Sequence, residues 1–245
     1  METVNFLPDM HRVHIVDDDD SFRRSVSRLL QISGFATVGY RCAGEYLLRN
    51  HPSCPSCLVL DMLMPGPSGL ELLDALAARP EAPPVILVTA YSSIPITVQA
   101  MKAGAIDLLT KPIEQEHLVR SVRAGLELDA KRRAAREERR QIQERYRELT
   151  DCERDVLVGV VNGRLNKQLA ASLGICERSI KSYRARVMRK MRAPSLVSLI
   201  RAAKLLGISE HAPPPPPRLM RTETTVNTLS GMAMQESVRR AANGT

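Results

Sequence analysis

Short apolar runs alternate with longer segments of helical periodicity over the first half of this 245-residue chain. Five runs have the length and composition of strands: VHIV, ATVGY, CLVL, VILVT and IDLLT. Apolar residues recur at helical spacing in the segments between and after these runs, at 22–32, 43–50, 70–78, 97–103 and from 114 onward. This alternation predicts an α/β domain built on a five-stranded, doubly wound parallel sheet. Runs that are apolar throughout, such as VILVT, are typical of strands buried on both faces.

A different pattern begins near residue 126. Residues 126–158 contain neither Gly nor Pro, and their middle is rich in charged helix formers. We expect a long solvated helix here that joins two domains. Ile142, Tyr146 and Leu149 are spaced as a short seam for a partner helix, and a plain helical spacer accounts for the segment equally well. Short amphipathic helices should follow at about 152–162, 166–173, 177–191 and 195–206.

These patterns divide the chain into four parts. We expect an α/β domain at 10–128, a helical linker at 129–148, an all-α domain at 149–208 and a tail at 209–245. The tail carries PPPPP and little periodicity, so it is expected to be extended at the prolines and otherwise disordered.

Charge separates the two halves. The net charge of the chain is +8, but residues 1–128 hold 11 Lys and Arg against 15 Asp and Glu, and the remainder holds 24 against 12. A basic all-α region favours nucleic acid as a partner over a membrane surface. No apolar run approaches the ~18 residues of a membrane span, and the start METVNFLPDMHR lacks the pattern of a signal peptide. We therefore expect a cytoplasmic protein.

The five cysteines are scattered and do not form a disulfide framework. His51, Cys54 and Cys57 in HPSCPSC have the spacing of metal ligands, but no second cysteine pair completes a tetrahedral site. Cys57 also begins an apolar run in which a small buried thiol fits. A structural cysteine is the favoured interpretation.

Polar residues follow four of the predicted strands. Asp17 and Asp18 follow the first strand, Asp61 the third, Thr89 ends the fourth and Lys111 follows the fifth. In an open parallel sheet, ligands gather outside the carboxyl ends of the strands. Carboxylate oxygens suit Mg²⁺, and an ammonium with a hydroxyl suits a phosphoryl group. The set predicts a phosphoryl-transfer site in which a carboxylate is the nucleophile.

Two further acids, Asp19 and Asp20, complete the run VHIVDDDDSF. They are better placed in the turn and at the start of the next helix, where carboxylates favour the positive end of the helix dipole. We do not expect them to bind metal.

The first domain resembles a known family over residues 10–128. VDDDDSFRRSVSRLL, VLDMLMPGPSGLELL and IPITVQAMKAGAIDLLTKP are similar to receiver domains of two-component response regulators, in the FixJ branch of the NarL/FixJ family. The resemblance implies a flavodoxin-like fold with Asp61 as the phosphoacceptor. It implies Mg²⁺ ligands at Asp17, Asp18, Asp61 and the carbonyl of Leu63.

The resemblance also assigns roles near the fifth strand. It implies that Thr89 and Lys111 contact the phosphoryl group and that the peptide between Lys111 and Pro112 is cis, a form that proline tolerates at small cost. The family usually has Phe or Tyr three residues before the lysine, as a switch that swings inward on activation. This chain has Leu108 there, which puts an aromatic switch in doubt.

The last domain is basic, with 12 Lys and Arg against 4 Asp and Glu in residues 149–208. Within NKQLAASLGICERSIKSYRARVMRKM, a short helix stops at Gly174 and a basic helix follows, which is the helix-turn-helix pattern. The segment is similar to the LuxR-type DNA-binding domain. That resemblance implies a four-helix domain that dimerises through its last helix, at about 195–206.

One face of the basic helix should pack on its domain and the other should enter the major groove of DNA. The packed face is expected to hold Ile180, Tyr183, Val187 and Met191. The DNA-facing side is expected to hold Arg178, Lys181, Ser182, Ala185 and Arg189. Lys181 and Ser182 are candidates for base contacts and Ala185 for a thymine methyl. Phosphate contacts are expected from Asn166, Lys167 and Arg189.

Together these features predict a response regulator that controls transcription and is not an enzyme acting on a substrate pool. Its expected partners are a sensor histidine kinase, double-stranded DNA and a second copy of the chain, with RNA polymerase as a further candidate. Two alternative functions make different demands on the sequence. A haloacid-dehalogenase-type phosphatase would need an Asp where Leu63 stands, which rejects it. A phosphate-independent regulator that uses its receiver for dimerisation stays open because of Leu108.

Overall fold

The computed structural model describes residues 11–49, 54–91 and 93–208. The chain divides into two compact units, residues 1–141 and 142–245, which are described separately. This division falls inside one helix, α5 (Gln115–Arg147), and within the segment predicted as a linker. The predicted tail and His51 lie outside the described residues.

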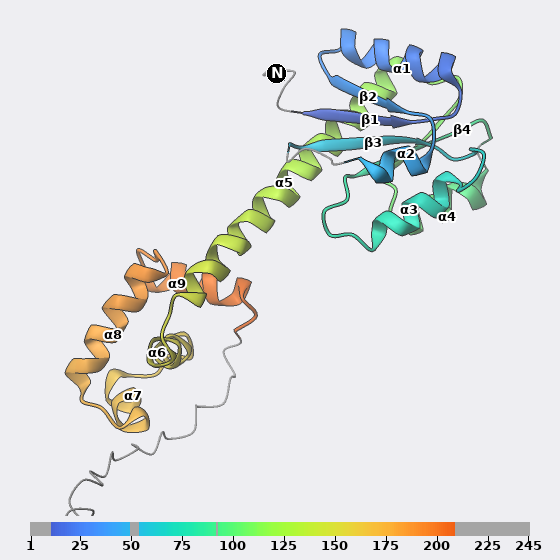
Figure 1. The fold of residues 1–245 in the computed structure, drawn as a ribbon. Helices are drawn as coiled ribbons and strands as arrows, with labels where there is room; N and C mark the ends of the chain where they lie inside the picture. The colour runs from blue at the N-terminus through green and yellow to red at the C-terminus, as the bar shows by residue number, and fades with distance from the viewer. Residues whose placement is uncertain (1–10, 50–53, 92, 209–245) are drawn as a thin grey trace, which may run out of the picture. The chain divides into compact units, whose positions relative to one another are not determined.

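The first unit is a five-stranded parallel sheet with the order β2-β1-β3-β4-β5, which confirms the predicted fold class (Figure 1). The strands are β1 (Arg12–Val16), β2 (Ala36–Tyr40), β3 (Ser56–Asp61), β4 (Val85–Thr89) and β5 (Asp107–Thr110). The intervening helices are α1 (Asp20–Ile32), α2 (Ala43–Leu48), α3 (Gly69–Ala77) and α4 (Ile94–Lys102), and α5 follows β5.

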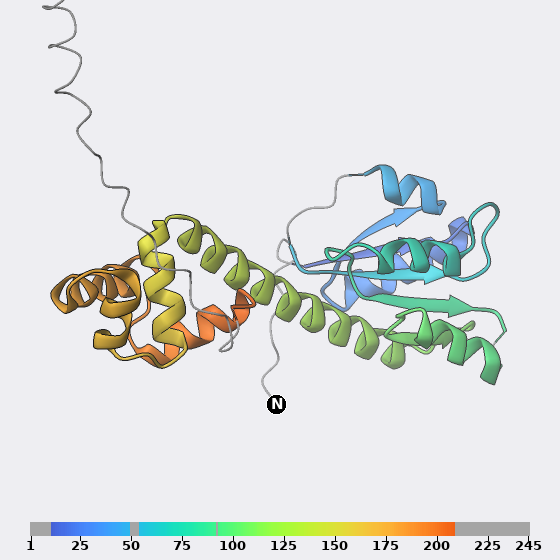
Figure 2. The ribbon, with the colours of Figure 1, turned by 90° about the horizontal axis from the view of Figure 1, so that it is seen from below.

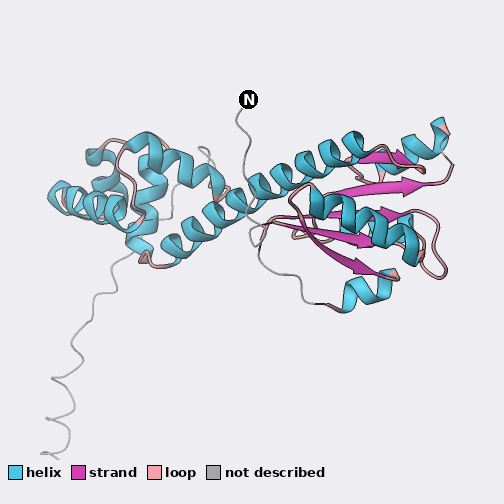
Figure 3. Cartoon of the chain, turned by 90° about the horizontal axis from the view of Figure 1, so that it is seen from above, coloured by secondary structure: helices cyan, strands magenta, loops and turns pink. Residues whose placement is uncertain are grey.

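Two apolar clusters cover the two faces of this sheet. Leu30 of α1 and Leu118 of α5 pack in one cluster with Val59 of β3. Tyr46 of α2 and Leu72 of α3 pack in the other, together with residues of α4. Figure 1 shows α1 on one side of the strands and α2, α3 and α4 on the other, and Figure 3 shows the strands behind one of these helical layers. Because both faces are covered, the strands need the continuous apolar runs that the sequence contains.

The strand register determines which side chains meet at the carboxyl edge of the sheet. Val16 pairs with Leu60 between β1 and β3, so Asp17 and Asp61 follow at the same level. Thr89, the last residue of β4, pairs with Thr110, which precedes Lys111. The sheet therefore brings the predicted polar residues to one edge.

A glycine allows α3 to start close to the end of β3. A Cβ on Gly69 would lie 2.2 Å from the carbonyl oxygen of Asp61 and 2.9 Å from Cα of Met62. The helix itself begins with a capping box, in which Ser68 and Glu71 satisfy each other's backbone amides. The absence of a side chain at Gly69 thus lets the helix approach the backbone of the strand that carries Asp61.

In the described part of the second unit, four short helices follow the end of α5: α6 (Asp151–Val161), α7 (Asn166–Leu173), α8 (Glu177–Lys190) and α9 (Leu196–Leu205) (Figure 2). No Gly or Pro separates α5 from α6. Instead Thr150 caps α6, accepting a hydrogen bond from the amide of Glu153, whose carboxylate accepts one from the amide of Thr150. This reciprocal cap marks the new helix.

The proposed seam on the linker has a different use in the structure. Ile142 and Leu149 are buried in the core of the second unit, and Tyr146 packs against that core. Leu157 of α6 belongs to the same cluster. These three apolar positions are therefore covered by their own unit, which removes the reason to reserve them for a partner helix.

We expect Gly69→Ala to lower the free energy of unfolding by about 1–3 kcal/mol, because the new methyl group overlaps backbone atoms that cannot move aside cheaply. Gly44→Ala in α2 is the matched control, since the nearest atom to its Cβ is Cys42 Sγ at 3.9 Å. That change should be neutral or stabilise by about 0.5–1 kcal/mol. Urea unfolding of both variants measures the difference. Equal effects would mean that the close approach at Gly69 does not constrain the fold.

Candidate functional site

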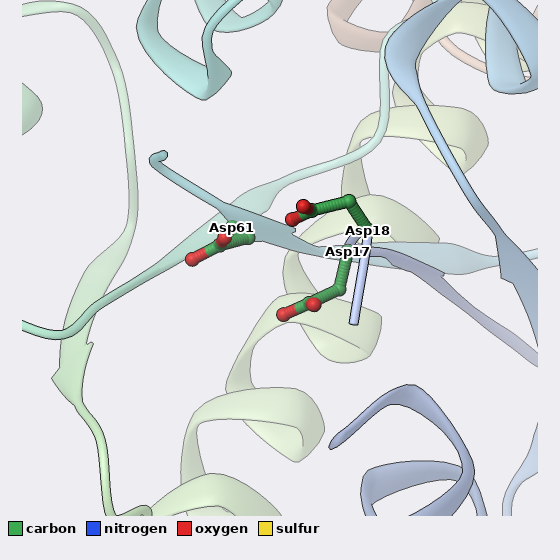
Figure 4. Close-up of side chains that lie close together, drawn as sticks. All are labelled: Asp17, Asp18 and Asp61. Atoms are coloured by element: carbon green, nitrogen blue, oxygen red, sulfur yellow. The ribbon is translucent and has the colours of Figure 1, made fainter. Parts of the chain in front are cut away.

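Three carboxylates converge at the carboxyl edge of the sheet (Figure 4). Asp17, Asp18 and Asp61 each offer one oxygen, and these oxygens all lie within 4.8 Å of one another. Asp17 and Asp61 are buried, at 1% and 6% exposure, while Asp18 is exposed. The structure thus brings together acids from the ends of two strands, β1 and β3, that are far apart in the sequence.

Lys111 supplies the positive charge at this cluster. Its Nζ lies 2.8 Å from Oδ2 of Asp17 and 3.3 Å from Oδ1 of Asp61. It also lies 4.0 Å from the centre of the Phe22 ring, a distance suited to a cation–π contact. The peptide between Lys111 and Pro112 is cis, as the resemblance implies. Burial alone would lower the pKa of Lys111, but the hydrogen bond and charge of Asp17, helped by Asp61, raise it above its usual value.

The charge balance of the cluster favours a cation. Burial raises the pKa of Asp61; Lys111 counteracts this, while Asp17 and Asp18 add to it. One ammonium does not neutralise three carboxylates. Mg²⁺ holds oxygen ligands at 2.0–2.1 Å, so neighbouring ligand oxygens lie about 3 Å apart. Carboxylate oxygens already within 4.8 Å of one another reach such spacing by small side-chain movements. The donor set therefore fits the predicted ion.

Hydrogen bonds that involve backbone groups hold Asp17 in place. Asp17 Oδ1 accepts a hydrogen bond from the amide of Asp19 at 2.9 Å, and Arg23 donates to the carbonyl of Asp17. Asp19 is the N-cap of α1 and accepts from the amides of Ser21 and Phe22, which lower its pKa. This places Asp19 in the capping role expected for it. Sequence reasoning missed Arg23, which contacts this backbone carbonyl and also the carboxylate of Asp20.

Thr89 and Leu63 lie near the cluster in different ways. The Thr89 side chain is buried, and its hydroxyl donates to the carbonyl of Tyr91 at 2.8 Å while accepting from the Tyr91 amide at 3.2 Å. Contact with a phosphoryl group would require this hydroxyl to turn. The Leu63 side chain is 63% exposed, and the role of its carbonyl stays a prediction.

Leu108 occupies the position at which the family usually has an aromatic residue. It is half-buried and packs against the cluster that contains Leu87 and Ala100. It pairs with Leu87 across β4 and β5. Leu108 is thus part of the packing between the sheet and the helices on the α4 side.

The two cysteines of HPSCPSC differ in their burial. Cys57 is fully buried in β3, and burial raises the pKa of its thiol. Cys54 is half-buried. Within the described ranges, neither belongs to a group of side chains that could hold a metal ion. The structural interpretation of Cys57 agrees with its position.

In the second unit, α8 presents the predicted two faces. Ile180 and Val187 are buried at 0% and 1% exposure, and Met191 is buried beyond the helix. Tyr183 is half-buried in the same core. All five residues of the opposite face are exposed, namely Arg178, Lys181, Ser182, Ala185 and Arg189. The orientation of α8 is therefore as the periodicity predicts.

The start of α7 is tied to α8 by a contact that the sequence did not reveal. Oδ1 of Asn166 accepts a hydrogen bond from Arg184 at 2.8 Å, and Asn166 is half-buried. Lys167 beside it is exposed. Asn166 thus helps to fix the angle between the two helices, in addition to the phosphate contact predicted for it.

Two other basic residues of α8 face inward. Glu153 of α6 is 2% exposed and pairs with Lys190 at 2.7 Å and Arg186 at 3.7 Å. Burial would raise the pKa of Glu153, but the hydrogen bonds from Lys190 and the Thr150 amide lower it. These bases orient α8 on α6. Some basic residues of α8 therefore stabilise the domain, while others are exposed.

Comparisons with known families agree with this division. Residues 13–123 match the response regulator receiver domain, and residues 147–203 match bacterial regulatory proteins of the luxR family. No helix in the described part of the chain is long and apolar enough to cross a membrane. A receiver joined to a LuxR-type DNA-binding domain defines a transcriptional response regulator, a class that is not enzymatic.

Individual relatives narrow the class. Nodulation protein W of Bradyrhizobium diazoefficiens is 43% identical over 81% of this chain and 88% of its own length. Transcriptional regulatory protein FixJ of Azorhizobium caulinodans is 41% identical over 83% and 96%. The solved structure of the response regulator StyR has a TM-score of 0.72, with 41% identity over 80% of this chain and 98% of its own. The chain belongs to the NarL/FixJ family of two-component response regulators.

We expect Asp61→Asn to raise the free energy of unfolding in EDTA at neutral pH by about 0.5–2 kcal/mol, because it removes a buried charge from a repulsive cluster. Lys111 keeps its partner Asp17 in this variant. Because the folded-state pKa of Asp61 is raised, the wild type loses stability as pH rises from the ordinary Asp pKa through the folded value. The variant should lack this component.

Mg²⁺ should stabilise the wild type more than Asp61→Asn, since a ligand that binds only the folded state stabilises it. Urea unfolding with EDTA and with Mg²⁺ measures both effects. Asp74→Asn, at an exposed position of α3, should change neither. An Asp61→Asn variant that is less stable than the wild type in EDTA would contradict the repulsion argument.

Proposed function

We propose that a sensor histidine kinase in the cytoplasm donates a phosphoryl group to Asp61 and that the phosphorylated chain regulates transcription by binding DNA. A carboxylate oxygen of Asp61 attacks the phosphorus, the bond from phosphorus to the kinase histidine breaks, and an acyl phosphate forms. The observation that carries this proposal is the convergence of Asp17, Asp18 and Asp61 around the ammonium of Lys111.

The other residues of the cluster have separate roles in this reaction. Asp17, Asp18 and the carbonyl of Leu63 would hold Mg²⁺ together with Asp61. The ion neutralises charge on the transferred group. Lys111 would exchange its present contact with Asp61 for one with a phosphoryl oxygen. Thr89 would contact the phosphoryl group after its hydroxyl turns away from the Tyr91 carbonyl.

The second unit would supply the output. The exposed side of α8 would enter the major groove, with its N-terminal part nearest the base edges. Dimerisation through α9 is supported by exposed apolar residues there: Leu196 is 43% exposed and Val197 is 76% exposed. Two copies would place two such helices on one DNA site.

Leu108 favours a second candidate function, DNA binding that does not depend on phosphate. With a leucine at the aromatic switch position, the receiver would serve as a dimerisation module and DNA binding would not depend on phosphate. The acid cluster and Lys111 favour the phosphate-dependent function, because a module used only for dimerisation has no need to bury two repelling carboxylates.

We expect Asp61 to be the only phosphorylation site. Incubation with a small phosphodonor and Mg²⁺, followed by proteolysis and mass mapping, should place the label on the peptide that carries Asp61. Asp61→Asn should abolish the label, and Asp74→Asn should retain it. Stable label in Asp61→Asn would show that another residue is the acceptor.

Lys181 and Lys167 should differ in the kind of DNA contact they make. Lys181→Ala should change the preference among single-base variants of the site, by roughly 1–3 kcal/mol at one position. Lys167→Ala should weaken all variants about equally and reduce the salt dependence. Binding to a panel of sites at two salt concentrations distinguishes the two. A uniform loss in Lys181→Ala, with the order of preference unchanged, would make Lys181 a phosphate contact.

A further inference from the structure

The first unit contains a groove of about 990 Å³ at the edge of the sheet opposite to the acid cluster. Ser56, the first residue of β3, lines it, whereas Asp61 is the last residue of that strand. The other walls come from the end of α2, the segment after α3 and the middle of α5. Its volume is at the upper end of the ~300–1,000 Å³ of ligand pockets.

The walls of this groove are rich in arginine. Two acids, Glu81 and Glu137, are outnumbered by five bases: Arg49, Arg79, Arg133, Arg136 and Arg140. Arginine presents a planar fork of donors that matches phosphate oxygens in pairs. The excess of guanidinium groups therefore selects an anion with several oxygens.

A buried carboxylate holds two of these arginines in position. Asp129 of α5 is 0% exposed, and its Oδ2 accepts from the Ser56 amide at 2.8 Å and from Nε of Arg133 at 2.7 Å. Its Oδ1 lies 3.6 Å from Arg136, which also donates to the carbonyl of Pro80. Ordering a free arginine on binding costs side-chain entropy. Here that ordering is built into the fold.

Donor capacity remains for a ligand. Arg133 uses Nε in its contact with Asp129, and its terminal nitrogens make no hydrogen bond to a described residue. Arg79 is exposed, and its side chain makes no hydrogen bond or ion pair within the described ranges. Both side chains line the groove. They offer the guanidinium groups that a bound anion would need.

The groove also has an apolar part. Leu47 is 36% exposed and lines it together with Tyr46, Leu76, Ala82 and Pro83. A flat apolar group would cover these side chains, while a chain of anionic oxygens would reach the arginines. An inorganic anion would contact only the arginines.

We propose that this groove binds a nucleoside polyphosphate, with the phosphates at Arg79 and Arg133 and the base over the apolar part beside Leu47. The site is separate from the acid cluster, which takes a cation and a phosphoryl group. Because Arg133 and Arg136 lie on α5, the ligand would also stabilise the stretch of that helix that Asp129 ties to β3.

The test is calorimetric titration of the full-length chain with ATP and, separately, with inorganic tripolyphosphate. EDTA keeps metal away from the acid cluster. We expect saturable binding of ATP with a dissociation constant below about 1 mM, and weaker binding of tripolyphosphate, which lacks the base. Absence of saturable ATP binding would overturn the proposal, and equal affinities would overturn the placement of the base.

Three variants locate the site. Arg79→Glu should weaken ATP binding by about tenfold or more. Arg28→Glu, which reverses an exposed arginine of α1, and Lys181→Ala on α8 should bind ATP as the wild type does. ATP affinity that is lost in Lys181→Ala but kept in Arg79→Glu would assign the anion to the DNA-facing helix and overturn the proposal. Leu47→Asp, which places a charge on the apolar part, should weaken ATP more than tripolyphosphate.

Discussion

The first unit depends on one ammonium group that lies between two buried carboxylates. Lys111 contacts Asp17 and Asp61, which β1 and β3 deliver to the same edge of the sheet. Without an opposite charge nearby, two buried acids whose oxygens lie within 4.8 Å of each other would each favour the protonated form. Lys111 reduces the repulsion between these carboxylates but does not neutralise their combined charge. That residual negative charge suits a divalent cation, on which the proposed transfer of a phosphoryl group to Asp61 would depend.

A similar use of charge organises the second unit. Glu153 is buried on α6 and draws Lys190 and Arg186 of α8 toward it. These contacts fix the rotation of α8 about its own axis, so that Lys181 and its exposed neighbours face away from the core. In both units a buried acid is paired with bases from a distant part of the chain. In the receiver the pairing positions the carboxylates of the acid cluster, and in the DNA-binding domain it orients the exposed face of α8.

Much of this could be predicted because the signals are local. Continuous apolar runs indicate buried parallel strands, and the polar residues that follow them must meet at one edge. The contacts that were missed join residues far apart in sequence, often through backbone atoms, as when Asp129 accepts from the Ser56 amide. Periodicity alone also left the use of Ile142 open, because an apolar stripe does not reveal which surface covers it. The bond between Asn166 and Arg184 depends on the crossing of two helices, which no spacing rule supplies.

We propose that the acid cluster controls DNA binding. The most direct measurement is the affinity of the full-length chain for its DNA site before and after treatment with a phosphodonor and Mg²⁺, for the wild type and Asp61→Asn in parallel. Treatment should tighten DNA binding by about tenfold or more in the wild type and leave the DNA affinity of Asp61→Asn unchanged. Equal affinity of the treated and untreated wild type, with Asp61 demonstrably phosphorylated, would contradict it and favour a receiver that serves only to pair two copies of the chain.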